Sequence, residues 1–409
     1  MKSEDFKEKS VSFFLIAVFL FFPISMALGY IAMALVLLFW LSSGKVKFYW
    51  SFIGSKIIVW VVLGLYAVML FGILYTDANS ADIFIHLSKY SKLLLIPAFI
   101  ALLADDRLRH RCMSAYALAM LLILASVYAN IWWDLPWSKT HNQGWSADHT
   151  VIGDYITQGI MMTFFVVVAL DRGLRENKTG RRIAWFAVSG LAAISIVYLS
   201  KGRTGYLLLA AALFVFAVFS VSGFRRWVVL SALAVAGFII ISTAENLQQR
   251  IESAVTEIHT SDRMEITSIG GRINFWKNTL RLIEERPLVG WGTGSYHDQW
   301  CKAVTEPGWC EFGRWHPHNQ FLFFWMEHGL AGLLLFVAMV LAPVVAAYQA
   351  MPRERRLVLS FAAIFVIDSL INASLWSSRE SHFFVVMLAW VLAQAWSAPA
   401  KPSTTKGAL

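Results

Sequence analysis

The chain has 409 residues, of which 58% belong to the apolar set AVILMFWYC and only 15% are charged, with a mean hydropathy of +0.59. A typical soluble domain is about 45–50% apolar and about 25% charged, which argues against a soluble enzyme, a disordered chain or a disulfide scaffold. The net charge of +9 indicates basic loops facing an anionic membrane leaflet. Nucleic acid is not an expected partner, because no Lys/Arg-rich run is interleaved with aromatic residues.

Long apolar segments predict an all-α polytopic membrane protein with about twelve transmembrane helices, since a spanning helix needs roughly 20 mostly apolar residues. In chain order, the predicted spans are 11–24, 27–43, 56–74, 89–104, 113–132, 151–170, 183–200, 205–222, 227–243, 328–349, 357–374 and 383–397. The first segment resembles a signal peptide, but its apolar character continues to Trp40 and predicts a retained span.

The short loops predict the orientation of these spans. With a cytoplasmic N-terminus, most basic residues of the short loops fall on the cytoplasmic side, as the positive-inside rule requires. Representative members, one for each such loop, are Lys45, Arg107, Arg172, Arg225 and Arg353. We therefore expect both chain termini in the cytoplasm.

The domain organisation follows from these spans. We expect nine spans in 1–243, a periplasmic loop domain in 244–317, and a re-entrant segment with three spans in 318–397. The remaining 398–409 then form a cytoplasmic tail.

The polar segment 244–317 has its own predicted structure. A helical pattern runs from Glu245 to His259, and apolar residues at helical spacing predict an amphipathic helix from about Arg272 to Arg286. Pro287 ends that helix, and a Gly- and Trp-rich coil follows it.

Two of the three cysteines, Cys301 and Cys310, lie in this outer loop. In an oxidising periplasm such a pair forms a disulfide, whereas Cys112, near the inner end of a span, stays reduced. Zinc is the alternative, because further ligands are near: His297, Asp298, His316 and His318. No CxxC or HxxxH spacing is present, so the prediction is a disulfide and no metal site.

Three charged clusters lie on the outer side, where charges near hydrocarbon are costly and tend to mark function. They are 201–205 in a very short turn, 270–272 at the start of the amphipathic helix, and 314–320 where the long loop re-enters the membrane. Guanidinium groups match phosphate oxygens, so Arg203 and Arg272 predict an anionic guest, best a phosphate or pyrophosphate headgroup.

Each cluster also has a structural interpretation. Arg203 is compatible with a snorkelling interfacial residue, and His316 and His318 with structural caps. Arg272 is compatible with an exposed charge, although a cation at a helix start opposes the helix dipole.

The same clusters carry sequence patterns of one family. The matching segments, with the family pattern in parentheses, are 318–332 (H-N/S/Q-x9-G-x-x-G), 203–207 (R-x-x-x-L), 271–276 (G-R-x-x-x-W) and 287–294 (hP-hhG-hG-x-G). In these patterns and their order, the region from about 200 to 350 resembles the bacterial O-antigen ligases, relatives of the Wzy-type polymerases and the pilin-type O-oligosaccharyltransferases.

The resemblance implies a GT-C-like glycosyltransferase of the bacterial inner membrane. Such a ligase transfers O-antigen from undecaprenyl pyrophosphate to a sugar hydroxyl of lipid A–core in the periplasm, completing lipopolysaccharide. The transfer is inverting and is expected to need no metal, nucleotide sugar or other cofactor. The oligomeric state is not implied.

The resemblance also implies roles for single residues. His318 is the expected general base, because imidazole is neutral near pH 7 and accepts a proton from an attacking hydroxyl. Arg203 and Arg272 are expected to stabilise the pyrophosphate leaving group. Residues expected to orient the base or to bind substrate are His316, Asn319, Arg314 and Lys201, with Arg379 as a further helper.

Two other functions remain open. A Wzy-type polymerase or a protein O-oligosaccharyltransferase carries related motifs, although the short tail Ala398–Leu409 favours the ligase. A transporter of a lipid-linked or anionic solute is the weaker alternative, because paired interrupted spans and internal repeats are not seen in the sequence.

Overall fold

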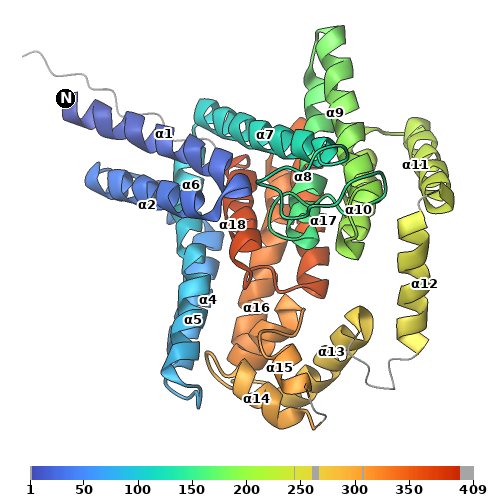
Figure 1. Ribbon diagram of the computed structural model, residues 1–409. Helices are drawn as coiled ribbons and strands as arrows, with labels where there is room; N and C mark the ends of the chain where they lie inside the picture. The colour runs from blue at the N-terminus through green and yellow to red at the C-terminus, as the bar shows by residue number, and fades with distance from the viewer. Residues whose placement is uncertain (1, 244, 260–266, 306–307, 397–409) are drawn as a thin grey trace, which may run out of the picture.

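The computed structural model describes residues 2–243, 245–259, 267–305 and 308–396, and over these ranges the chain is a bundle of helices without a strand (Figure 1). The helices are α1 (Lys2–Ile24), α2 (Met26–Ser42), α3 (Val46–Ile53), α4 (Ile57–Gly72), α5 (Ser80–Tyr90), α6 (Leu95–Leu103), α7 (Asp106–Ala129), α8 (Tyr155–Arg175), α9 (Thr179–Tyr198), α10 (Arg203–Ser220), α11 (Phe224–Thr243), α12 (Glu245–His259), α13 (Ser268–Glu285), α14 (Tyr296–Ala303), α15 (Trp309–Gly313), α16 (Gln320–Gln349), α17 (Pro352–Ile371) and α18 (Ser378–Ala393). A short 3₁₀ helix, Ser91–Leu94, joins α5 to α6. The expected all-α class is confirmed, and the predicted tail 398–409 lies outside the described residues.

The number of candidate spans is smaller than the sequence predicts. Among the described residues, seven helical segments are long and apolar enough to cross a membrane, or eight if the bent pair α2 and α3 counts as one span. A helix stands at each of the twelve expected positions, but several are short or charged. α4 and α18 have 16 residues each, or about 24 Å of helix against a hydrocarbon core of about 30 Å.

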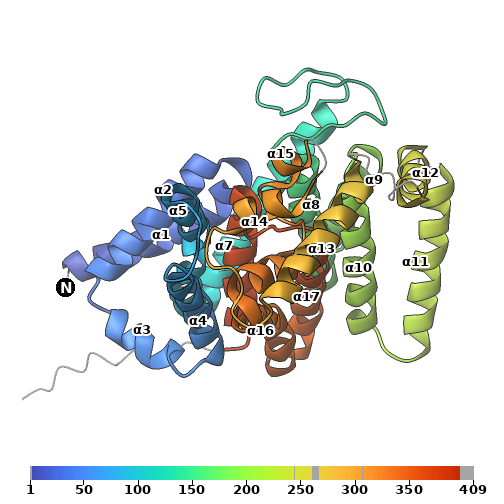
Figure 2. The same ribbon diagram turned by 90° about the horizontal axis from the view of Figure 1, so that it is seen from below.

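The two predicted sets of loops lie at opposite ends of the bundle. In Figure 2 the turn between α10 and α11 lies at the lower edge, and the segment 130–154 lies at the upper edge. At the end that carries the basic short loops, polar contacts join α8 to α17. Arg175 donates to the Arg353 carbonyl (2.9 Å), and Arg356 pairs with Asp171 (2.8 Å).

Aromatic packing holds the centre of the bundle together. Phe164 of α8 packs edge-on against Phe361 of α17 (5.7 Å between ring centroids), and Phe365 stacks on Phe384 of α18 (4.8 Å). Lipid tails are as apolar as these side chains, so close packing rather than the hydrophobic effect favours this arrangement. The core thereby fixes the helix ends that carry the candidate site.

α16 is interrupted at Gly329, whose φ of 61° and ψ of −157° are not helical. In a continuous helix, the Leu330 amide would donate to the Met326 carbonyl. Here it donates to the Leu288 carbonyl (3.1 Å), and Met326 accepts from the Trp291 amide (3.0 Å) instead. The helix and the Gly- and Trp-rich coil thus exchange hydrogen bonds at the Gly329 interruption.

Gly329→Ala is expected to destabilise the protein by about 2–5 kcal/mol, because the left-handed backbone is strained for alanine and the new methyl group overpacks its site. A Cβ at Gly329 would lie 2.2 Å from the Leu288 carbonyl oxygen. Thermal unfolding in detergent measures the loss. Gly190→Ala in α9 is the control, since apart from the neighbouring backbone of α9 itself no described residue lies within 4 Å of the position that its new methyl group would take. Equal melting temperatures for the two variants would contradict the interlocked arrangement.

Candidate active site

Three chain segments that are distant in the sequence meet at one end of the bundle. Arg203 is the first residue of α10, Arg272 lies in the first turns of α13, and His318 lies in the turn before α16. Figure 1 shows α13, α14 and α15 gathered around the beginning of α16. Arg272 lies near both of the other side chains, because its charge interacts with Arg203 and with His318. The structure therefore brings together the three residues expected to carry the reaction.

His318 has an unusual backbone conformation and is partly buried. Its φ is +50°, a left-handed value that is uncommon for a residue other than glycine and often marks a functional site. The ring is stacked on Phe275 at 5.6 Å with only 11° between the planes, and His316 packs edge-on at 4.4 Å. Its Nδ1 is buried without a hydrogen-bond partner among the described residues. The ring is thus fixed in place but keeps a nitrogen available.

The surroundings of His318 keep its imidazole neutral. Burial lowers the pKa of His318 to about 4, with a further contribution from the positive charge of Arg272. An imidazole with this pKa is in its basic form at neutral pH and accepts protons.

His316 supports the backbone of His318. The His318 amide donates to Nδ1 of His316 (3.3 Å), which requires an unprotonated nitrogen at that position. Burial, followed by the charges of His318, Lys89 and Arg272, lowers the pKa of His316 well below its ordinary value. Both histidines are therefore neutral, and His316 acts on the turn geometry through this hydrogen bond.

Arg203 has a carboxylate partner, Glu257, that lies outside every sequence motif. Its Nη2 donates to Oε1 of Glu257 in α12 (2.6 Å), and Oε2 of Glu257 accepts from the Ile269 amide (2.7 Å). Burial raises the pKa of Glu257, but these two hydrogen bonds and the charge of Arg203 outweigh it, so the pKa lies below the ordinary value. Nε and Nη1 of Arg203 are buried without a partner among the described residues.

Arg272 is a partly buried cation with few hydrogen-bond or ion-pair partners among the described residues. Its nearest hydrogen bond is a long one to Oδ1 of Asn372 (3.5 Å), and no described carboxylate lies within ion-pair distance. Asn372 in turn donates to Asp368 (2.7 Å). Burial lowers the pKa of Arg272, as does the charge of Arg203, but a guanidinium stays protonated in proteins. Donors left unpaired in this way favour binding of an anion.

Two lysines extend the positive charge beyond the predicted set. Lys89 lies over the ring of Trp376 (4.1 Å) and donates to the Trp376 carbonyl (3.2 Å), and Lys92 donates to Ser381 (2.5 Å). The sequence does contain a signal for them, because both stand at the start of the predicted span 89–104, where a charge is costly. The signal for Asp368, inside the predicted span 357–374, is of the same kind.

The remaining predicted residues lie around the centre. Asn319 caps α16 by accepting from the Leu322 amide (3.0 Å) and donates to the Leu370 carbonyl (3.0 Å). Lys201 is exposed on the turn before Arg203. Arg379 donates to the Pro23 carbonyl (3.2 Å), at the turn between α1 and α2.

Arg314 borders a cavity of about 320 Å³ beside the histidine turn. It pairs with Glu311 (2.8 Å) and lies over Trp315 (4.2 Å). The cavity is also lined by polar and aromatic side chains, including Asp82, His297 and Trp376. It therefore combines flat apolar faces with hydrogen-bonding groups.

A second, apolar cavity of about 810 Å³ lies between α10 and α11. Its walls are apolar side chains of both helices, such as Leu207 and Ile240, together with Ile251 of α12. Because Arg203 begins α10 and Glu257 lies in α12, this cavity adjoins the charged centre. It has the character of a lipid site.

A disulfide links the two short helices that precede the histidine turn. Cys301 of α14 is bonded to Cys310 of α15, which leaves no thiolate for a metal, and Cys112 is free and buried. Beneath the disulfide, Nε1 of Trp300 donates to the Trp309 carbonyl (2.9 Å). Both rings contact Phe275, on which His318 is stacked.

The double variant Cys301→Ser/Cys310→Ser is expected to lose about 2.5–3 kcal/mol of stability, because the bond closes a short loop and restricts the unfolded chain. The melting temperature of the wild type should fall to that of the variant when a reductant is added. The variant itself should not respond to the reductant. A wild type that is insensitive to reduction would refute the stabilising role.

The fold and the site together define a polytopic membrane protein with a cationic, histidine-containing centre at one end of a helical bundle. Residues 188–337 match the family model described as O-antigen ligase, and the Arg203, Arg272 and His318 motifs all fall within them. The resemblance predicted from the motifs is thereby confirmed over this stretch. The chain is also 23% identical over 194 residues to an uncharacterized protein of Haemophilus influenzae, a match that covers 45% of this chain and 48% of the relative. The matched region is thus about half the length of that relative.

Proposed function

We propose that the protein is an O-antigen ligase, which transfers O-antigen polysaccharide from undecaprenyl pyrophosphate to a sugar hydroxyl of lipid A–core. The family match supports glycosyl transfer with lipid-linked polysaccharide substrates. One observation carries the proposal: two partly buried guanidinium groups with unpaired or weakly paired donors lie near a partly buried, neutral imidazole. Cations of this kind stabilise an anionic leaving group, and a neutral imidazole accepts the proton of a hydroxyl nucleophile.

The donor occupies the arginine side of the centre in this proposal. The pyrophosphate accepts hydrogen bonds from Arg203 and Arg272, whose planar donors match its oxygens. The polyprenyl chain lies in the apolar cavity between α10 and α11, whose lining includes Tyr206, one turn after Arg203 in α10. Both features are adjacent in the structure, as the two halves of a lipid pyrophosphate are.

The histidine and the two arginines have different roles in the chemical step. His318 accepts the proton of the acceptor hydroxyl as its oxygen bonds to the anomeric carbon. The glycosidic C–O bond to the pyrophosphate breaks, and the negative charge that develops on the leaving group is stabilised by the two arginines. Attack from the side opposite the leaving group inverts the anomeric carbon. The residues present supply the base and the cations without a metal.

The acceptor approaches from the histidine side. The cavity lined by Arg314, Trp315 and Trp376 lies beside the residues that directly precede His316, and it offers aromatic faces and polar groups to sugar rings. In the proposed topology this end of the bundle faces the periplasm. The protein then lies in the bacterial inner membrane with both chain termini in the cytoplasm.

Transfer is expected to persist at its full rate in EDTA, because the two guanidinium groups take the place of a divalent cation at the leaving group. Transfer by the purified protein, measured with and without the chelator, tests this. Loss of activity that returns with added divalent metal would contradict the arginine-based mechanism.

The decisive experiment supplies purified protein in detergent with lipid-linked O-antigen and lipid A–core. Formation of lipopolysaccharide without any ion gradient supports a transferase and excludes simple transport. A deletion strain separates the related enzymes: a ligase defect accumulates lipid-linked O-antigen of normal length, whereas a Wzy-type polymerase defect shortens it. Unchanged lipopolysaccharide in the deletion strain, with a defect in protein glycosylation, would indicate an O-oligosaccharyltransferase.

A further inference from the structure

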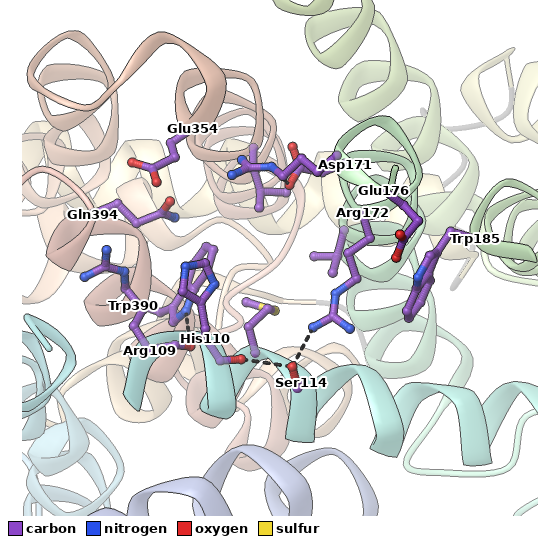
Figure 3. A pocket seen from close by; sticks show the side chains of 14 residues that line it. Arg109, His110, Ser114, Asp171, Arg172, Glu176, Trp185, Glu354, Trp390 and Gln394 are labelled. Carbon is purple, nitrogen blue, oxygen red and sulfur yellow. Dashed lines mark hydrogen bonds and ion pairs between the residues drawn. The ribbon is translucent and has the colours of Figure 1, made fainter. Parts of the chain in front are cut away.

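A polar cavity of about 320 Å³ lies at the end of the bundle opposite the candidate active site (Figure 3). It is bordered by the beginnings of α7 and α17 and by the ends of α8 and α18. Glu354 lies in the first turn of α17, whereas Asn372, which contacts Arg272, follows the last turn of that helix. The two sites are therefore separated by the length of a transmembrane helix.

Most charges around this cavity are already paired. Asp171 is held by Arg356 (2.8 Å) and Arg175 (2.7 Å). Arg109 pairs with Asp106 (2.5 Å) and donates to the Leu103 carbonyl. These groups neutralise one another and leave little attraction for a ligand.

Glu354 is the exception. Its side chain belongs to a residue that is only 6% exposed, and it has no hydrogen-bond or ion-pair partner among the described residues. Figure 3 shows it on the wall beside Gln394, facing the cavity. A carboxylate in the first turn of a helix is favoured by the helix dipole, but the dipole alone gives its oxygens no donor here. An unpaired carboxylate on the wall of a cavity is available to form a charge-assisted hydrogen bond with a cationic ligand.

The opposite wall carries available positive charge. Arg172 lies over the ring of Trp185 (4.9 Å) and donates to the hydroxyl of Ser114 (3.1 Å). Figure 3 shows Arg172 across the cavity from Glu354, with His110 between them. The remaining guanidinium donors suit a phosphate group.

We propose that this cavity binds the headgroup of a zwitterionic phospholipid, with the phosphate at Arg172 and a primary ammonium at Glu354. The separated opposite charges match a phosphate ester that carries an ammonium group. Met113, Val168 and Leu357 add apolar surface to the lining, and the cavity lies where spanning helices begin and end, at the depth of lipid headgroups. These features favour a lipid over soluble phosphoethanolamine. The proposal does not depend on the transfer reaction.

Native mass spectrometry of delipidated protein in detergent tests the assignment. Phosphatidylethanolamine should bind more tightly than phosphatidylglycerol, which has no ammonium, and than phosphatidylcholine, whose methylated ammonium cannot donate hydrogen bonds. Glu354→Gln should reduce the preference for phosphatidylethanolamine over phosphatidylglycerol about tenfold, the effect of one charge-assisted hydrogen bond. Arg172→Gln should weaken both lipids alike, because both carry the phosphate.

The control variant is Glu285→Gln, which removes the same charge from an exposed position of α13 and should bind as the wild type does. Soluble O-phosphoethanolamine is the second arm, and it should not displace the lipid at equal concentration. Equal binding of the three lipids by the wild type, or an unchanged preference in a folded Glu354→Gln variant, would overturn the proposal. Displacement of the lipid by the soluble compound would overturn the lipid assignment.

Discussion

His318→Ala is expected to lower the rate of glycan transfer by a factor on the order of 10²–10⁴, the usual contribution of a general base, and to leave the fold intact. The expectation rests on a ring stacked on Phe275 with a buried Nδ1 that has no partner among the described residues. Transfer by the purified variant, with lipid-linked donor and core acceptor in detergent, measures the loss. A melting temperature close to that of the wild type shows that the fold is retained.

Two control variants separate the role of His318 from that of any nearby imidazole. His316→Ala should lower transfer less, because His316 acts through its hydrogen bond to the His318 amide. His141→Ala, on the exposed loop between α7 and α8, should have no effect. Near-normal transfer by His318→Ala, together with loss in His316→Ala, would assign the base to His316.

The pH dependence of glycan transfer by the wild type should reflect the protonation of His318. Because the pKa of His318 is lowered to about 4, the basic form predominates above that pH and is lost as the pH falls through it. The value of kcat/KM, which reports the free enzyme, should therefore be constant near neutrality and should decrease at acidic pH. A decrease that begins at the ordinary histidine pKa would show that the ring is less buried than the structure indicates.

Arg272→Lys is the second substitution with a large expected effect. A lysine keeps the charge but not the planar pair of donors, so transfer should remain impaired, approaching the roughly 10²–10³-fold loss that follows removal of one stabilising donor. The substitution leaves Asn372 and Asp368 in place, so the loss should appear in kcat rather than in stability.

The matched control is Arg281→Lys, at an exposed position of the same helix. It should transfer glycan at the wild-type rate. Full activity of Arg272→Lys would indicate that bulk positive charge alone is sufficient at this position. An equal loss in both variants would indicate that the substitutions disturb α13 itself.

Local patterns were sufficient to predict much of the fold. The helix predicted for 245–259 is present with those bounds, and a helix stands at each predicted span, because hydropathy and helical spacing are properties of neighbouring residues. The number of membrane crossings was harder to predict. Residues 46–53 form a helix that is bent by 103° from α2, and no sequence pattern identifies such a bend.

The site was predictable only where motifs mark it. Arg203, Arg272 and His318 stand in recognisable patterns, whereas Glu257 is one of several polar residues on an amphipathic helix and gives no signal of its own. Its pairing with Arg203 depends on how α12 lies against α13, which is a tertiary contact. Lys89 and Asp368 do carry a signal, because each is a charged residue within a predicted span. Charged residues are costly there and tend to mark functional sites.

α11 buries none of its residues against the rest of the protein, and both views show it set apart from the bundle (Figures 1 and 2). In a membrane, acyl chains must therefore supply the packing that other helices receive from their neighbours. A thicker or thinner bilayer changes the tilt of such a helix at little cost, and α12 with Glu257 follows directly after it. The lipids around α11 thus act as a wall of the apolar cavity between α10 and α11, and membrane thickness becomes one of the factors that position Glu257 beside Arg203.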